Sequence, residues 1–212
     1  MNFDFPDANS DHSPQSDSAQ RKQQLRATIR GDRRALSSAI KADKDSLIAS
    51  HAVEYLRTHD ISVATAFVPM RFEPGGAELP FALANEVQHL LLPRIATAND
   101  GPPLMDFCAF DPRTEQLVPG PMGILEPPGP AFSGFPAGID LFFIPALAVD
   151  STGARLGQGG GYYDTNLAEL APDAEVCAIV YAHEHLDHVP TEPWDLRVTS
   201  VLTEDGFKRL QV

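Results

Sequence analysis

The sequence has 212 residues, of which 43% are hydrophobic, enough for one sizeable core. Its 16 basic and 29 acidic residues give a net charge of −13, which argues against a nucleic-acid-binding surface, because such a surface needs a local basic excess. It contains neither an apolar run long enough to span a membrane nor a secretory signal at its N-terminus. We therefore expect a cytoplasmic protein with no nucleic-acid partner and no membrane partner.

The N-terminal stretch differs from the rest of the chain. Residues 1–20 hold four Asp and no Lys or Arg, which predicts a disordered acidic tail over residues 1–18 and a single domain over residues 19–212. Cys108 and Cys177 are the two cysteines, and they lie far apart in apolar surroundings. We expect free, buried thiols rather than a disulfide.

Basic residues are concentrated in the first predicted helical region, residues 20–59, which we expect to be interrupted near Gly31. Lys22, Arg26 and Arg30 follow the spacing i, i+4, i+8, which places them on one stripe of a helix. This stripe is either a solvated charged face or the counter-surface for an anionic ligand. In so acidic a chain, the second interpretation gains weight.

The remaining elements alternate between strands and helices. The pattern predicts strands within 61–70, 104–110, 139–149 and 175–182, a helix followed by a short strand within 79–95, and a helix over 163–170. Apolar strands separated by helices indicate an α/β fold with three layers, a mostly parallel central sheet and helices on both faces, as in Rossmann-like proteins. Ligands bind such sheets at the carboxyl ends of the strands, where the loop that carries Glu73 would lie.

A glycine-rich loop, RLGQGGGYYD over residues 155–164, follows the apolar strand. It does not match the dinucleotide-binding pattern, because Tyr162 stands where the last glycine belongs, and the chain has no G-K-[ST] for a P-loop. Backbone amides at a helix N-terminus, aided by Arg155, suit a phosphate group, and Asp164 suits Mg²⁺. The plainer interpretation is a tight turn in which Asp164 caps the helix.

The run HEHLDH at residues 183–188 is a competing motif, since it fits the H-x-H-x-D-H signature of metallo-β-lactamase-type zinc hydrolases. Those enzymes draw further ligands from well downstream. Here His188 is the last histidine and 24 residues follow it. A polar loop is the better account, and the zinc hydrolase is the weaker alternative.

The segment DLFFIPALAVDSTGARLGQGGGYYD, followed by NLAEL, resembles the 5-formyltetrahydrofolate cyclo-ligase (5,10-methenyltetrahydrofolate synthetase) family. The segments RKQQLRATIR, AFVPMRFEP, LLLPRI, LVPGPMGILEPP and YAHEHLDHVPTEPWDLRV are similar to other parts of that family. The resemblance implies an ATP-dependent cyclisation of 5-formyltetrahydrofolate to 5,10-methenyltetrahydrofolate, with release of ADP and phosphate through a phosphorylated formyl group. It implies small-molecule substrates and a magnesium ion. We also expect a monomer, although the sequence carries no direct signal of the oligomeric state.

The resemblance also implies roles for individual residues. Arg155 and Tyr163 would be catalytic, and Asp164 would bind Mg²⁺. The residues implied to contact ATP are Lys22, Arg26, Arg155, Leu156, Gly157, Gln158, Gly159, Gly160, Gly161, Tyr162 and Tyr163. The residues implied to contact the folate are Val68, Glu73, Met122 and Tyr163.

The chain departs from the family pattern at two positions near the predicted nucleotide site. Thr165 stands where relatives often have Arg, and Thr199 stands where many have a second metal-associated Asp. Either Asp195 takes that role, or Asp164, the nucleotide and water hold the metal alone. These departures support a second hypothesis, a catalytically weak member of the fold that binds folate or nucleotide.

Overall fold

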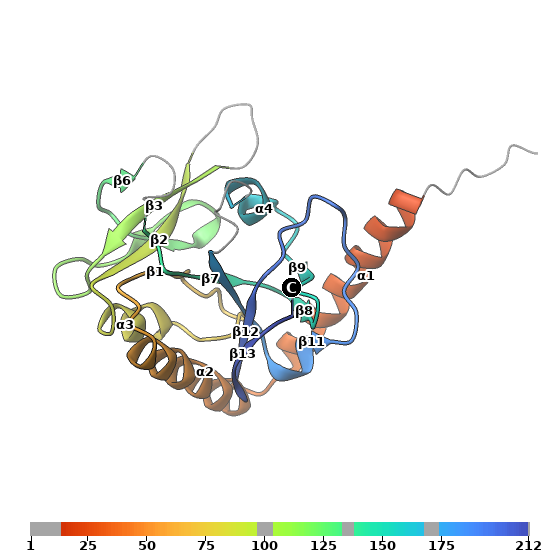
Figure 1. Ribbon diagram of the computed structural model, residues 1–212, viewed down its shortest axis with the longest axis horizontal. Helices are drawn as coiled ribbons and strands as arrows, with labels where there is room; N and C mark the ends of the chain where they lie inside the picture. Colours follow the sequence, from red (N-terminus) through yellow and green to blue (C-terminus); the bar gives the residue numbers. More distant parts are fainter. Residues whose placement is uncertain (1–13, 97–103, 133–137, 168–173, 212) are drawn as a thin grey trace, which may run out of the picture.

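The computed structural model describes residues 14–96, 104–132, 138–167 and 174–211 (Figure 1). The helices in these ranges are α1 (Pro14–Ala35), α2 (Ser38–Thr58), α3 (Leu79–Ala84) and α4 (Tyr162–Asn166), with the 3-10 turns η1 (Pro121–Gly123) and η2 (Ala182–Glu184). The strands are β1 (Val63–Thr65), β2 (His89–Ala96), β3 (Leu104–Phe110), β4 (Val118–Pro119), β5 (Leu125–Glu126), β6 (Ala131–Phe132), β7 (Leu141–Pro145), β8 (Ala148–Asp150), β9 (Arg155–Leu156), β10 (Glu175–Ile179), β11 (His185–Leu186), β12 (Ser200–Thr203) and β13 (Gly206–Arg209).

The central sheet has the strand order β13-β12-β10-β7-β1-β2-β3-β6. Neighbouring strands from β12 through β2 run parallel, whereas β13, β3 and β6 pair antiparallel at the two sides. The prediction of an α/β fold with a mostly parallel central sheet is confirmed. The middle strands are apolar along their whole length because a central parallel strand is buried on both faces.

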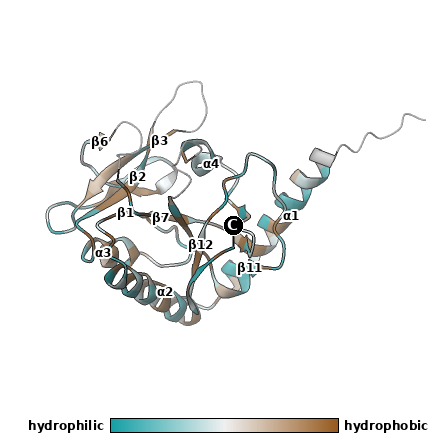
Figure 2. Cartoon of the chain, in the orientation of Figure 1, coloured by the Kyte–Doolittle hydropathy of each residue, from teal (hydrophilic) through white to brown (hydrophobic). Residues whose placement is uncertain are grey.

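Side chains of β7 alternate between two hydrophobic clusters, one on each face of the sheet. Leu141 and Phe143 belong to the cluster that packs under α2 and α3, while Phe142 and Ile144 pack with Leu167 at the end of α4. Figure 2 shows the hydrophobic colour in strands such as β12 and the hydrophilic colour along the outer parts of α1 and α2. Helices therefore cover both faces, as predicted.

A second, smaller sheet has the order β11-β8-β9, and α1 packs against it. Ile29 of α1 packs in one cluster with Leu147 and Leu156. The apolar strand predicted over residues 139–149 is thus two strands in two sheets, because the chain leaves the central sheet after Pro145, which has no amide hydrogen to continue the ladder.

The predicted helical interruption near Gly31 was wrong. Gly31 lies inside α1, and the break falls between Ala35 and Ser38. Ser37 has an extended backbone and its hydroxyl accepts a hydrogen bond from Ile40 N at 3.3 Å, so it acts as the N-cap of α2. A good cap sets the boundary, whereas one exposed glycine in a long helix costs only about 1 kcal/mol.

Helix α1 overlaps the end of the acidic tail that the sequence predicts over residues 1–18. Helix α1 begins at Pro14, and Asp17 in its first turn forms an ion pair with Arg21. Proline is tolerated in a first turn and an acidic residue is favourable there, which explains the earlier start. Residues 1–13 lie outside the described part of the chain, as do residues 168–170 of the helix predicted over 163–170.

Cys108 and Cys177 are both free and buried, as predicted. Cys177 lies on β10 inside the central sheet, and burial raises the pKa of its thiol well above the usual range. In the described ranges, none of the helices has the length and apolar character needed to cross a membrane.

Candidate active site

The glycine loop connects β9 to α4 at the carboxyl edge of the central sheet. Gly159 and Gly161 have positive φ angles of 100° and 71°, which residues with a side chain rarely adopt. At Gly157, a Cβ atom would lie 2.9 Å from Nη1 of Arg155. The guanidinium can therefore take this position only because residue 157 has no side chain. Among the described residues, no acceptor binds the amide hydrogens of residues 158–161. These free amides are suited to an anion.

Gly159→Ala should lower the free energy of unfolding by about 1–2 kcal/mol, since its φ is unfavourable for any L side chain. Gly31→Ala is the matched control, because a Cβ there meets no atom within 4 Å and the residue is helical. That control should gain about 0.5–1 kcal/mol. Urea unfolding measures both changes. Equal effects of the two variants would contradict the assigned role of the loop's backbone.

The basic stripe of α1 contacts this loop. Arg26 Nε donates to Gly157 O at 2.9 Å, and Arg30 Nη2 donates to Gln158 O at 2.7 Å. Lys22 forms an ion pair with Asp195 on the other side of the site. Burial and then the charge of Arg30 lower the pKa of Arg26. The three positions therefore do lie on one face of the helix, and that face is turned to the glycine loop rather than to solvent alone.

A polar hollow of about 500 Å³ lies between α1 and the glycine loop. It is lined by Lys22, Arg26, Arg155, Leu156, Gly157, Gly159, Gly161, Asp164, Thr165, Trp194 and Asp195. Cations and free amides gather here in a chain that is acidic overall. The hollow thus has the electrostatic character that an anionic ligand requires.

Arg155 is the most buried cation of this hollow, at 5% exposure. Its Nη2 donates to Asp164 Oδ1 at 2.7 Å, and its Nη1 lies 3.4 Å from Pro145 O. Within the described chain its buried Nε has no hydrogen-bond partner. A buried guanidinium with spare donor capacity is poised to bind an additional acceptor.

Asp164 lies in the first turn of α4, where a carboxylate is favoured by the helix dipole. Its Oδ1 accepts from Arg155 and from Leu196 N at 3.1 Å, while its Oδ2 has no hydrogen-bond partner among the described residues. Asp195 is the second carboxylate of the hollow. One or two carboxylates beside phosphate oxygens are the ligands that Mg²⁺ prefers, so these residues fit the ion that the sequence implied.

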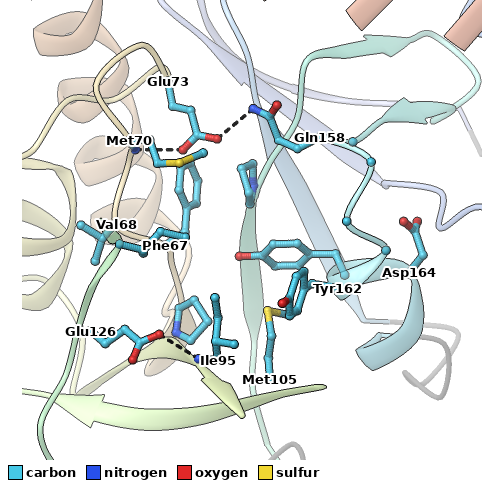
Figure 3. Close-up of a pocket in the computed structure, with 18 of the residues that line it drawn as sticks. Phe67, Val68, Met70, Glu73, Ile95, Met105, Glu126, Gln158, Tyr162 and Asp164 are labelled. Carbon is cyan, nitrogen blue, oxygen red and sulfur yellow. Dashed lines mark hydrogen bonds between the residues drawn. The ribbon is translucent and has the colours of Figure 1, made fainter. Parts of the chain in front are cut away.

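An apolar cavity of about 320 Å³ adjoins the polar hollow and is also lined by the glycine loop (Figure 3). It shares Arg155, Gly157, Gly159, Gly161 and Asp164 with the polar hollow. Its other lining residues are Phe67, Val68, Met70, Glu73, Pro93, Ile95, Met105, Ile124, Leu125, Glu126, Pro145, Gln158, Gly160, Tyr162 and Tyr163. Several follow β1 or end β2 and β7, so the cavity lies at the carboxyl edge of the sheet, where a ligand was expected.

Glu73 is held in this cavity by contacts from both sides. Its Oε2 accepts from Met70 N at 2.9 Å and its Oε1 accepts from Gln158 Nε2 at 3.0 Å, as Figure 3 shows. The amide oxygen of Gln158 in turn accepts from Arg30 Nη2 at 2.9 Å. Lys41 Nζ donates to Glu73 O at 2.9 Å. The glycine loop and the Glu73 loop are thereby joined by one side-chain amide.

Tyr162 and Tyr163 both line the apolar cavity and neither lines the polar hollow. Burial raises the pKa of Tyr163, and the Glu73 carboxylate raises it further. The Tyr163 phenol therefore keeps its proton at physiological pH and can donate a hydrogen bond to an oxygen in the cavity. The structure thus places Tyr162 and Tyr163, both implied to contact ATP, in the cavity that Arg155 lines but Lys22 and Arg26 do not.

Several of the lining residues were not predicted from the sequence. Met105, Ile95 and Glu126 reach the apolar cavity from the β2–β5 region, and Trp194 reaches the polar hollow. Glu126 is buried and its Oε1 accepts from Ile95 N at 2.9 Å. Its place in the quoted LVPGPMGILEPP was the available signal. The side chain of Met122 lies outside the described part, and Ile124 and Leu125 of the same loop line the cavity.

The HEHLDH run does not form a metal site. Glu184 is 1% exposed and both of its carboxylate oxygens accept from Arg33, at 2.7 and 2.8 Å. His188 is exposed and lies 3.9 Å from Asp150. The described chain holds no cluster of three His, Cys, Asp or Glu side chains that could bind a metal ion. The zinc-hydrolase alternative therefore has no metal site among the described residues.

Thr199 and Thr165 have different surroundings. The Thr199 hydroxyl accepts from Val176 N at 2.9 Å and ties β12 to β10, and the residue lines neither cavity. Thr165 lines the polar hollow. Of the two departures that supported a weak binding protein, only Thr165 lies beside the predicted phosphate site.

A mostly parallel sheet with two adjoining cavities that share one glycine loop defines a class of protein, an α/β enzyme that brings two small ligands together at the carboxyl edge of its sheet. A family model, the 5-formyltetrahydrofolate cyclo-ligase family, matches residues 18–204. The chain belongs to that family and is an enzyme with its cyclo-ligase activity, a ligase of one-carbon folate metabolism.

Individual relatives agree with this assignment. The chain is similar to a 5-formyltetrahydrofolate cyclo-ligase of Mycolicibacterium smegmatis, with 37% identity over 86% of this chain and 93% of the relative. One from Haemophilus influenzae is 25% identical over 86% of this chain and 97% of the relative.

Two solved structures share the fold. The 5,10-methenyltetrahydrofolate synthetase of Aquifex aeolicus superposes with a TM-score of 0.69 at 23% identity, covering 90% of this chain and 93% of that one. The synthetase of Mycoplasma pneumoniae gives a TM-score of 0.63 at 22% identity, over 86% and 98% of the two chains.

Proposed function

We propose that this enzyme converts 5-formyltetrahydrofolate and ATP into 5,10-methenyltetrahydrofolate, ADP and phosphate. The observation that carries the proposal is the shared glycine loop, which separates a cation-lined hollow from an apolar cavity and contributes to both. A transferred phosphoryl group must leave one ligand and join the other, so the two ligands must meet. Only this loop borders both cavities within the described chain.

On the nucleotide side, the polar hollow binds the triphosphate. The free amides of residues 158–161 and the guanidinium of Arg155 neutralise the charge that develops on the transferred group. Lys22 and Arg26 supply further positive charge. When Mg²⁺ is bound, it neutralises phosphate oxygens, and Asp164 with Asp195 would hold it.

On the substrate side, the apolar cavity binds the folate ring system, with Val68 against it and the Glu73 carboxylate as a hydrogen-bond acceptor. The formyl oxygen attacks the γ-phosphorus and the bond to the ADP oxygen breaks. N10 then attacks the formyl carbon and loses its proton, and the carbon–oxygen bond breaks as phosphate leaves. No covalent intermediate on the protein is needed, and the neutral Tyr163 can donate a hydrogen bond to an oxygen at the junction.

The direct test follows the ultraviolet absorbance of the methenyl product from 5-formyltetrahydrofolate, with and without Mg-ATP. We expect product only when both nucleotide and magnesium are present, with one ADP released for each product formed. Product formed without nucleotide would contradict the ATP dependence. Saturable binding of folate and ATP without any product would instead favour the weak binding protein.

The free, buried thiols of Cys108 and Cys177 support a reducing cytoplasm as the compartment of this enzyme.

A further inference from the structure

Trp194 is the only tryptophan of the sequence, and it is the most exposed of the large hydrophobic residues in the described ranges, at 65%. It lines the polar hollow, whose other side chains are mostly charged. An indole ring contributes a large apolar face, which is normally buried in a core or against a partner. Packing within the described part of the chain does not account for its position.

The turn that carries Trp194 is held on both sides. Asp195 N donates to Glu192 O at 3.1 Å, and Glu192 N donates to Asp195 Oδ2 at 2.6 Å, which closes the turn. The Asp195 carboxylate also pairs with Lys22 of α1, and Leu196 N donates to Asp164 Oδ1 at 3.1 Å. Two carboxylates of the site therefore fix the backbone beside Trp194, while its ring stays open to solvent.

We propose that Trp194 is the platform on which the nucleobase of ATP stacks. This inference rests on the proposed function, because it assigns a binding site to the nucleobase, the end of ATP opposite to the phosphates. The glycine loop and Arg155 attract the phosphates to one part of the hollow, and a nucleoside triphosphate carries a flat aromatic base at its other end. An indole face and a base form a favourable stack, and the hollow, at about 500 Å³, is of ligand size.

If the base stacks on Trp194, the indole ring recognises the base and not the phosphates. It acts on the face of the base and contributes nothing to the binding of phosphate groups. Trp194 should therefore affect the affinity for ATP and leave the affinity for inorganic tripolyphosphate unchanged. A purely structural role for the residue would affect both ligands together.

The first experiment uses the intrinsic fluorescence of the full-length enzyme, which reports on Trp194 alone because the sequence has one tryptophan. In the presence of Mg²⁺, ATP should quench this fluorescence saturably. Saturating tripolyphosphate should compete with ATP and restore the signal. No change with ATP, or the same change with tripolyphosphate alone, would overturn the proposal.

The second experiment measures steady-state kinetics of Trp194→Ala and Trp194→Phe. The alanine variant should raise the KM for ATP about tenfold, whereas the phenylalanine variant should recover most of the loss. The KM for 5-formyltetrahydrofolate and the inhibition constant of tripolyphosphate should stay unchanged in both. Phe132→Ala is the matched control, an exposed aromatic residue on β6 that lines neither cavity.

The outcomes separate this proposal from the function on which it depends. If the unaltered enzyme needs no nucleotide for turnover, the proposed function fails. If turnover requires Mg-ATP but Trp194→Ala keeps the KM for ATP of the unaltered enzyme, only the stacking platform fails. A loss of tripolyphosphate binding in the alanine variant would likewise contradict it, since the ring would then be shaping the phosphate site.

Discussion

Arg155→Ala should lower kcat/KM for ATP by about 10- to 150-fold, because a hydrogen bond from a charged donor to phosphate contributes roughly 1.5–3 kcal/mol. Arg155 has the strongest case for such a contact, since its guanidinium is nearly buried, borders both cavities and keeps Nε without a partner in the described chain. The variant also releases Asp164 from its ion pair. The absorbance assay of the methenyl product at varied Mg-ATP measures the effect.

Arg113→Ala is the matched control for that experiment. Arg113 forms the same kind of ion pair, with Asp111, but it is exposed and lines neither the polar hollow nor the apolar cavity. Its replacement should leave kcat/KM unchanged, because exposed pairs contribute little. If Arg155→Ala behaved like Arg113→Ala, the assignment of the phosphate site to this loop would be wrong.

Arg33→Met should lower the free energy of unfolding by about 3–5 kcal/mol, because it leaves the Glu184 carboxylate buried without its cation. Arg33 is 2% exposed and joins α1 to η2, and its Nη2 also donates to Ala146 O at 2.7 Å. Denaturant unfolding at neutral pH gives the difference from the midpoint and slope.

The double variant Arg33→Met with Glu184→Leu tests the cause. Replacing both charges with apolar groups removes the stranded carboxylate, so this variant should recover most of the loss. The hydrogen bond from Tyr181 N to Glu184 Oε2 is also lost, which keeps the recovery incomplete. If the double variant were less stable than Arg33→Met alone, the stability would depend on Glu184 itself rather than on the pairing.

Helix α1 connects these two predictions. Its buried Arg33 fastens the helix to η2, and its stripe of Lys22, Arg26 and Arg30 then lies against the loop and the hollow. A protein with a net charge of −13 repels a triphosphate at long range. Fixing the cations on one face of one rigid helix gives a local positive site within that unfavourable field.

Much of the fold and part of the site could be predicted from the sequence, because their signals are local. The apolar run at 139–149 and the alternation of strands and helices indicated a buried parallel sheet, and three glycines after a strand indicated a backbone with free amides. The i, i+4, i+8 spacing put three cations on one helix face because helical geometry is regular. The quoted motif also identified the family.

Other features depended on contacts between segments far apart in the chain, and only the tertiary structure decided them. Only the structure shows that Glu184, inside the HEHLDH run, pairs with Arg33, and that Gln158 meets Glu73 from a distant loop. Trp194 came to the polar hollow through the packing of its turn against Lys22 and Asp164. Local propensity sets the elements, whereas the pairing of buried charges and the lining of a cavity follow from how the elements pack.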